Sequence, residues 1–220
     1  MGVISDSGIL KLISEGLVDF AQSETDYDSV VRQVNPNTLD LSLGMHCRRP
    51  KENTTPFVFG APHSTGDYWE LIRMDPERGI LLKPGDIFLG CSREYLRIPK
   101  DVCGQVFTKS SLGRVFINHM MAGVIDAGFE GTITLEFKNE GQHSIIIPYG
   151  ARVVQLQFSR LESVPERDYS VRKNRYQGQV MPEPAREERK DANGLAETVA
   201  ANVEQFFDKE NGVPRDGKTP

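Results

Sequence analysis

Residues 107–141 read FTKSSLGRVFINHMMAGVIDAGFEGTITLEFKNEG, which places polar and charged side chains among glycines between two β-like segments. In its second half, over 132–138, apolar residues occupy every second position. Side chains two residues apart share one face of a strand, so this alternation predicts a strand with one buried face. Glu136 then projects from the opposite face, toward solvent or a pocket. A strand carboxylate is more often solvated or salt-bridged than catalytic, so the pattern alone does not assign it a role.

Outward from this window, short apolar or alternating runs punctuated by Gly and Pro extend from Thr38 to about Phe158. This is typical of an all-β barrel or sandwich, so the expected fold class is mainly β. The polar stretch 50–76 is either a long surface loop or an excursion with its own hairpin. Strands are expected at 38–43, 80–82, 87–91, 102–108, 132–138, 145–147 and 152–158.

The two ends of the chain have other patterns. Residues 5–16 predict a short amino-terminal helix that Gly16 can end. Beyond Phe158 a charged, Pro-containing segment predicts an extended arm. Near the carboxyl terminus, 194–208 approximates one amphipathic helical face. We expect one domain over 1–180, including the arm, followed by an extension over 181–220.

Composition sets further bounds. Of the 220 residues, 38% are hydrophobic and 26% charged, as in an ordinary soluble domain. The formal charge is −5 and no Lys/Arg block stands out, which argues against a nucleic-acid surface. No apolar run is long enough for a membrane span, and we expect a cytoplasmic protein, host cytoplasm if the source is viral. The three cysteines are far apart, which favours buried free thiols of a reducing compartment.

Polar residues in the 107–141 window suggest a ligand site. Ser110, Ser111 and Arg114 fall in a Gly-containing turn with Lys109 alongside, and together they offer hydroxyls, backbone N–H groups and two cations to phosphate oxygens. The alternative is a serine-rich turn with solvated cations. Asp126 precedes an Ala-Gly turn, where its carboxylate could accept a hydrogen bond from a sugar hydroxyl or simply stabilise the turn.

Longer blocks of the sequence resemble one family, the dCTP deaminases of the trimeric dUTPase superfamily. The match is carried by SSLGR at 110–114, AGVIDAGFEGTITLEFKN at 122–139, NPNTLDLSLG at 35–44, YGARVVQLQF at 149–158 and RYQGQ at 175–179. The resemblance implies a distorted jelly-roll-type β-barrel of the dUTPase-like fold. It also implies a homotrimer with active sites at subunit interfaces.

The family resemblance implies hydrolytic deamination of dCTP to dUTP and ammonia. In it Glu136 is the general base and proton shuttle for a water that attacks C4 of cytosine. A zinc deaminase would need H-x-E with a later P-C-x-x-C, and this chain has neither. No metal ligands are expected among the scattered histidines, and Mg²⁺ is expected to be bound through the nucleotide triphosphate. The four histidines are His46, His63, His119 and His143.

The resemblance assigns the remaining residues by role. Those expected to hold the attacking water or stabilise charge are Ser110, Arg114 and the carbonyl of Ala122. The resemblance assigns Ser111 and Arg114 to the phosphates, and Lys109, which lies beside them in the turn, is expected to contribute to substrate binding. Asp126 is expected at the deoxyribose 3′-hydroxyl. Those expected to close over base and triphosphate are Gln155, Tyr169, Arg175 and Gln179.

Other readings stay open. The same fold hydrolyses dUTP, using the aspartate at position 126 to activate water at the α-phosphate, and some relatives catalyse both reactions and release dUMP and diphosphate. Glu136 favours a deaminase, because simple dUTPases generally lack a carboxylate there. A catalytically silent regulator, with its carboxyl-terminal helix bound to a partner, is a third alternative. Met120 and Met121 replace a pair that in relatives carries a threonine linked to dTTP inhibition, so we expect altered or absent dTTP feedback.

Overall fold

The computed structural model describes residues 2–52, 55–119, 123–172, 175–186 and 194–203. The chain divides into two compact units. One comprises Met1–Pro50 and Leu71–Glu183, and the other comprises Lys51–Glu70 and Pro184–Pro220. Every residue of the predicted site belongs to the first unit.

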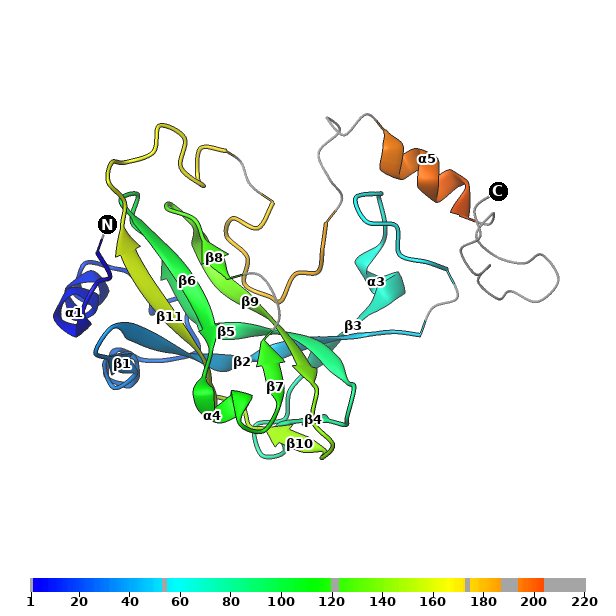
Figure 1. Ribbon diagram of the computed structural model, residues 1–220, viewed down its shortest axis with the longest axis horizontal. Coiled ribbons are helices and arrows are strands. Elements are labelled where there is room, and N and C mark those ends of the chain that lie inside the picture. Colours follow the sequence, from blue (N-terminus) through cyan, green and yellow to red (C-terminus); the bar gives the residue numbers. More distant parts are fainter. Residues whose placement is uncertain (1, 53–54, 120–122, 173–174, 187–193, 204–220) are drawn as a thin grey trace. The chain divides into compact units, whose positions relative to one another are not determined.

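The first unit is built on a nine-stranded sheet whose main path runs β7-β9-β5-β2-β11-β6-β8, with β1 and β3 also paired to β2. Its long strands pair antiparallel, and Figure 1 shows them curving so that the sheet curls into a half-barrel. A second sheet pairs β10 with β4. The strands are β1 (Val34–Asn35), β2 (Thr38–Pro50), β3 (Trp69–Arg73), β4 (Ile80–Leu82), β5 (Ile87–Arg97), β6 (Val102–Thr108), β7 (Ile117–His119), β8 (Val124–Ile125), β9 (Glu130–Asn139), β10 (Ile145–Ile147) and β11 (Arg152–Arg160). The expected mainly β fold is confirmed.

Among the described residues the helices are few and short: α1 (Asp6–Ser14), α2 (Tyr27–Val31), α3 (Thr65–Tyr68), α4 (Ser110–Gly113) and α5 (Leu195–Ala201). In α1 the buried residues Ile9, Leu12 and Ile13 lie on one face, as helical spacing requires. Gly16 follows with φ of 97°, a left-handed conformation that suits glycine and ends the helix. The predicted amino-terminal helix is confirmed.

The core lies between the curved strands and is formed by their inward-facing rows. Phe88 of β5 and Phe137 of β9 are fully buried and stack with ring centroids 4.8 Å apart. Leu156 and Phe158 bring the inward row of β11 into the same cluster. Burial of these apolar side chains is the main force that holds the sheet in its curled form.

Among the described residues, the carboxyl side chains of Glu94 and Asp40 have no exposed surface. Glu94 of β5 accepts hydrogen bonds from the hydroxyl and backbone amide of Ser42, at 2.6 and 3.0 Å, and from the side-chain amide of Gln33 at 2.9 Å. Burial raises the pKa of this carboxyl, and the three hydrogen bonds act against that rise. Glu94 therefore ties the segment before β1 to two central strands.

All seven expected strands are found, and three have the expected bounds: 80–82, 102–108 and 145–147. Instead of being only a loop, the described part of 50–76 contains α3 and β3, and β3 returns along β2. The helix α5 falls inside the predicted 194–208, of which 204–208 lie outside the described residues. No helix in the described part of the chain is both long and apolar enough to span a membrane.

Candidate functional site

Glu136 lies on the less buried face of β9. Its neighbours Leu135 and Phe137 are fully buried, while Glu136 is half-buried and its Oε2 atom is buried. The residue opposite it on β5 is Leu89, which is 9% exposed. The alternation of 132–138 therefore placed this carboxylate correctly, and its surroundings partly exclude water.

A second cluster forms around Asp40, a residue of β2 with no exposed surface. Lys109 Nζ lies 2.5 Å from Asp40 Oδ2, and Arg152 lies 3.5 Å from the same oxygen. Asn35 and Gln155 donate side-chain N–H groups to Oδ1 at 2.9 and 3.4 Å. Two cations and two amides thus compensate the cost of burying this carboxylate. Predicted site residues Lys109 and Gln155 are brought together here, on a partner that sequence reasoning did not single out.

The residues that follow Lys109 form the single helical turn α4. Ser110, Ser111 and Arg114 are all exposed, and the Arg114 amide donates to the Ser110 carbonyl at 3.0 Å. Arg114 lines a cavity of about 420 Å³ together with Phe116 and other residues of the following turns. The sequence indicated a turn, and the structure makes it a short helix that presents two hydroxyls and a guanidinium outward.

Asp126 lies in the turn between β8 and β9 and is exposed. Its carbonyl accepts from the Phe129 amide at 3.2 Å, which closes the turn. The arm packs against this turn: the Tyr169 amide donates to Ala127, and the Tyr169 and Phe129 rings meet edge to face at 5.4 Å. Tyr169 and Asp126 therefore lie at one turn.

The residue before Tyr169 fixes this junction. The Asp168 carboxylate accepts from the Ser170 hydroxyl at 2.5 Å and pairs with Lys100 at 2.9 Å. These two hydrogen bonds, that of Ser170 first, lower the pKa of Asp168 to about 2. Gly128 lies so close that a Cβ there would come within 3.0 Å of the Asp168 carboxyl carbon. Gly128, with φ of 80°, thus allows the arm to approach the turn.

We call residues 175–183 the strap, because they run along the first half of β9. The Gly178 amide donates to Glu130 at 2.7 Å, the Thr132 amide donates to Gln179 at 2.9 Å, and a parallel bridge joins Gly131 to Gln179. The Gln179 side-chain amide also donates to the Thr132 carbonyl at 2.6 Å. In this structure Gln179 therefore fastens the strap to β9, and Arg175 is the half-buried residue at which the strap begins.

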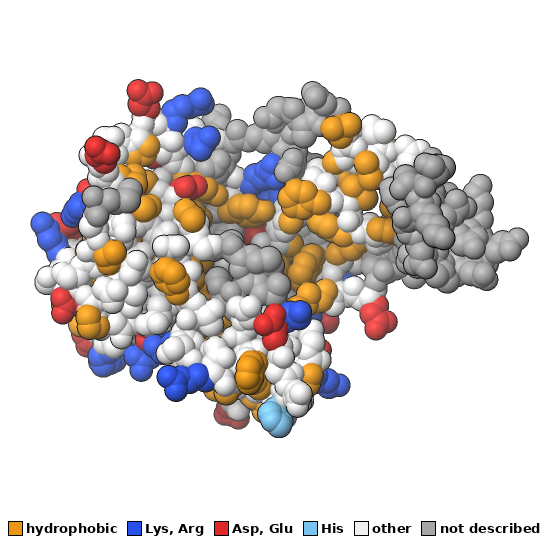
Figure 2. All heavy atoms as spheres, viewed as in Figure 1, with side chains coloured by type: hydrophobic (Ala, Val, Ile, Leu, Met, Phe, Trp, Pro, Cys, Tyr) orange, Lys and Arg blue, Asp and Glu red, His pale blue; other side chains and the backbone are white. Residues whose placement is uncertain are grey.

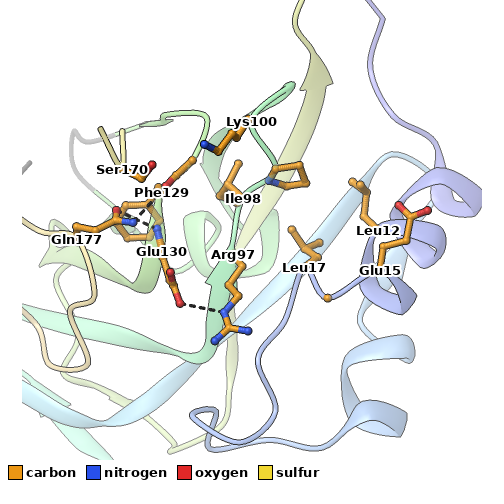
Figure 3. A pocket seen from close by; sticks show the side chains of 13 residues that line it. Leu12, Glu15, Leu17, Arg97, Ile98, Lys100, Phe129, Glu130, Ser170 and Gln177 are labelled. Carbon is orange, nitrogen blue, oxygen red and sulfur yellow. Dashed lines mark hydrogen bonds and ion pairs between the residues drawn. The ribbon is translucent and has the colours of Figure 1, made fainter. Parts of the chain in front are cut away.

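Gln177 is a second anchor of the strap, and sequence reasoning missed it. Its side-chain oxygen accepts from the Glu130 amide and its nitrogen donates to Gly128, both at 3.2 Å. Figure 3 shows Gln177 beside Phe129 and directed toward Glu130. A glutamine can satisfy a backbone donor and a backbone acceptor at once, but nothing in the sequence says which ones.

The cavity drawn in Figure 3, about 510 Å³, lies at the start of β9. Two of its cations are already paired. Arg97 contacts Asp19 at 2.7 Å and Glu130 at 2.9 Å, while Lys100 pairs with Asp168. These cations are poorly placed to neutralise a triphosphate, so the face of Glu136 and the exposed turn α4 are the better candidate site.

The remaining expectations concern metal ligands and thiols. In the part of the chain that the structure describes, no group of three or more His, Cys, Asp or Glu side chains could hold a metal ion. Cys47 and Cys91 are free and buried, and burial raises the pKa of both thiols to about 12, while Cys103 is free and half-buried. Ala122 and the Met120-Met121 pair lie outside the described residues.

Comparison with known proteins gives the family. Residues 3–161 match a family model described as dCTP deaminase-like. A dCTP deaminase of Halorubrum lacusprofundi is 35% identical over 187 residues, covering 84% of this chain and 90% of the relative. A dUMP-forming dCTP deaminase of Methanosphaera stadtmanae is 32% identical over 191 residues, covering 83% and 92%.

A solved structure agrees with these relatives. The 2′-deoxycytidine 5′-triphosphate deaminase of Agrobacterium tumefaciens superposes with a TM-score of 0.57 at 26% identity, over 71% of this chain and 48% of that one. The fold expected from the family resemblance is thereby confirmed. Because the family model spans most of the chain and the relatives align over most of their own length, the chain belongs to the dCTP deaminase-like family.

Proposed function

We propose that this protein hydrolyses dCTP to dUTP and ammonia without zinc, with Glu136 as the catalytic carboxylate. The observation that carries the proposal is the position of Glu136: half-buried, on the strand face beside the strap, in a chain of the dCTP deaminase-like family. A carboxylate with one buried oxygen is shielded from bulk water, and such shielding strengthens its interaction with a bound water and base.

The proposed reaction needs one group that first accepts a proton from water and then donates it to the substrate. Glu136 takes a proton from water as the oxygen bonds to C4 of cytosine, and the ring N3 receives that proton. A second proton passes from the added hydroxyl through Glu136 to the amino group, the C4–N4 bond breaks, and ammonia leaves as the C4 carbonyl forms. Ser110, Arg114 and the Ala122 carbonyl are proposed to orient the water and stabilise charge. One carboxylate within reach of both water and base can serve both steps.

Substrate binding is proposed to use the exposed groups around this centre. Ser111 and Arg114 would bind phosphate oxygens from α4, and Asp126 would accept from the 3′-hydroxyl. Lys109 would contribute from its position beside Asp40, where it also fixes the start of α4. Mg²⁺ would arrive on the triphosphate and neutralise part of its charge. The residues proposed to close over the nucleotide are Gln155, Tyr169, Arg175 and Gln179.

A homotrimer with sites shared between subunits is part of the proposal. Ser111 and Arg114, which are proposed to bind phosphate, are exposed in the single chain. Side chains that complete a site on a neighbouring subunit would be exposed in this way. Apolar side chains also reach the surface at the edge of the sheet: Phe107 of β6 is 43% exposed and Val124 of β8 is 72% exposed. Figure 2 shows apolar side chains at several places on the face in view. A neighbouring subunit would remove such surface from water.

A second candidate is the coupled reaction that yields dUMP and diphosphate. It is favoured by the names of several relatives, among them the dUMP-forming enzyme of Methanosphaera stadtmanae. In that case Asp126 would in addition activate a water at the α-phosphate.

Product analysis separates these candidates. Purified protein with Mg²⁺ would be incubated with dCTP, dCMP, CTP and dUTP separately, and the products resolved by chromatography. Conversion of dCTP to dUTP supports the proposal, and release of dUMP and diphosphate from dCTP supports the coupled reaction. Turnover of dUTP alone would replace both by a dUTPase, and no turnover of any nucleotide would favour a silent regulator.

The Glu136→Gln variant tests the mechanism itself. It retains the size of the side chain but cannot accept the water proton, so we expect dCTP binding within about threefold of the parent and deamination reduced by at least about 10³-fold. Binding would be measured by calorimetry and turnover by ammonia release. Deamination at the parental rate would rule out Glu136 as the base.

A further inference from the structure

We propose that Arg48 and Thr134 are positioning residues that hold the strap against β9, beside Glu136, before any nucleotide binds. This inference rests on the proposed deaminase function for its kinetic consequence, but its structural part can be tested without turnover.

Arg48 shares a face of the sheet with Glu136. Arg48 of β2 pairs with Leu89 of β5, and Leu89 pairs with Glu136 of β9, so the three side chains form one row across three strands. With adjacent strands about 4.8 Å apart, the Cα atoms of Arg48 and Glu136 are roughly 10 Å apart. Arg48 Nε donates to the carbonyl of Pro182 at 2.8 Å. The Arg48 guanidinium therefore starts from the same cross-strand row as Glu136 and binds the strap at Pro182.

Thr134 holds the same part of the strap from β9. Its hydroxyl oxygen accepts from the Glu183 amide at 3.1 Å and from the Gln179 side-chain amide at 3.3 Å. Thr134 precedes Glu136 by two residues, so their side chains share a face and their Cα atoms are roughly 7 Å apart. The strap is therefore fastened at two points near Glu136: by Arg48, in the same cross-strand row, and by Thr134, in the adjacent row of β9.

The backbone at the middle of the strap approaches β9 closely. A Cβ at Gly131 would come within 3.0 Å of the Gln179 carbonyl oxygen and 3.1 Å of its nitrogen. Gly131 also has φ of 145°, a conformation that glycine adopts readily. The strap packs where β9 has no side chain, and Arg48 and Thr134 then determine how its second half continues toward Glu136.

The consequence is a strap that is ordered in advance. A segment already held in its binding conformation does not lose that conformational freedom when ligand binds, so affinity rises without a new ligand contact. Loss of the anchors should therefore raise the KM for dCTP more than it lowers kcat, because strap order contributes to substrate and transition state alike.

The test compares Arg48→Met, Arg48→Lys and a matched control, Arg78→Met, whose side chain is 86% exposed and pairs with the neighbouring Asp75. Hydrogen exchange of the peptide covering 176–184 would be measured by mass spectrometry without nucleotide, alongside kcat and KM for dCTP. We expect Arg48→Met to exchange at least about fivefold faster there and to raise KM about tenfold, with kcat within about twofold of the parent. Arg48→Lys, which keeps a cationic donor, should recover most of both effects, and Arg78→Met should match the parent.

Thr134→Val provides an independent variant, since it keeps the shape of the side chain and removes the acceptor. It should reproduce the faster exchange over 176–184. Parental exchange and parental KM in both Arg48→Met and Thr134→Val would overturn the inference, as would a loss of kcat with unchanged KM. If the parent protein deaminates nothing yet the exchange differences appear, the proposed function fails while the anchoring role of these residues stands.

Discussion

Asp40 shows how much one buried side chain can organise. It has no exposed surface, yet it holds a lysine, an arginine and two amides contributed from the segments around β1, β6 and β11. Lys109 is also the residue from which α4 begins, so the buried carboxylate fixes the origin of the exposed Ser110-Ser111 pair. A structural charge inside the sheet thereby determines where the proposed phosphate ligands project.

The first prediction concerns this residue. Asp40→Asn keeps the shape but leaves Lys109 beside a neutral group in a mostly buried position, and we expect the free energy of unfolding to fall by about 2–4 kcal/mol. The measurement is the urea midpoint, followed by circular dichroism. Glu140→Gln, which changes an exposed acid to its amide, is the control and should shift stability by no more than about 0.5 kcal/mol. Equal effects of the two variants would show that the buried Asp40 cluster contributes no more to stability than an exposed acid does.

Asp168 gives a prediction on pH. Its pKa is lowered to about 2 from an ordinary value of 3.8, so the folded state binds this proton less readily than the unfolded state does. Its contribution to stability is present above about pH 4 and is lost as pH falls toward 2. The Asp168→Asn variant lacks that contribution at every pH. The gap between parent and variant in urea midpoint should therefore be widest above pH 5 and should narrow steadily toward pH 2. A gap that stays constant over this range would contradict the assignment.

At the scale of single residues, the sequence predicted which way a side chain faces better than it predicted which residue the side chain contacts. Alternation placed Glu136 on the less buried face of β9, because a two-residue period is a local property of a strand. Nothing local indicated that Lys109 pairs with Asp40, which lies 69 residues earlier, or that Gln177 binds the backbone of the turn at 128–130. Such partners are determined by how distant strands pack, and a single sequence does not display this.

At the scale of elements, the two faces of β9 have different roles. Leu135 and Phe137 complete the core, while Thr134 and Glu136 face the strap side. Leu135→Ala should therefore cost about 2–5 kcal/mol of stability, because a fully buried leucine leaves a cavity that its neighbours fill only in part. Lys138→Ala, on the other face, is the control and should cost less than about 0.5 kcal/mol. Chemical denaturation measures both, and a small effect at Leu135 would mean that the core can collapse around the gap.

Elements were predictable where the chain itself marks their ends. The strands at 80–82, 102–108 and 145–147 are bracketed by Gly, Pro, Ser or charged residues and were found with the expected bounds. The strands β1, β7 and β8 were missed. β1 and β8 have only two residues, too few to show a period, and β7 is not directly flanked by Gly, Pro or a charged residue. The sequence predicted a turn at α4 and not a helix, because Ser and Gly are weak helix formers and the helix has only four residues.

At the scale of the whole molecule, the exposed apolar side chains of β6 and β8 bear on assembly. If this edge meets a neighbouring subunit, Val124→Asp should place a charge in the interface, dissociate the trimer and abolish deamination, since the proposed sites are shared. Sedimentation would give the mass of the particle. Val164→Asp, at a position 57% exposed in the arm, is the control and should leave the assembly intact. A trimer that persists with Val124→Asp would locate the interface elsewhere.

The curled sheet itself could be anticipated only as a class from periodicity. Short alternating runs indicate a barrel or sandwich without stating the order of strands, and the neighbours of β9 are separated from it by very different lengths of chain. The resemblance to a family supplied the specific architecture. The two sources were thus complementary: periodicity predicted which face of a strand is buried and where strands end, and the family resemblance predicted how the strands are arranged.

The strap has one more consequence. β5 pairs with nearly the whole of β9 on one side, but on the other side β7 reaches only positions 137–139, and the strap takes up hydrogen-bonding groups near 130–132. Without it those amides and carbonyls would be open to any extended peptide, including another copy of the same strand. The segment proposed to close over a substrate therefore also guards the protein against edge-to-edge aggregation, and proteolytic loss of the tail would endanger solubility as well as turnover.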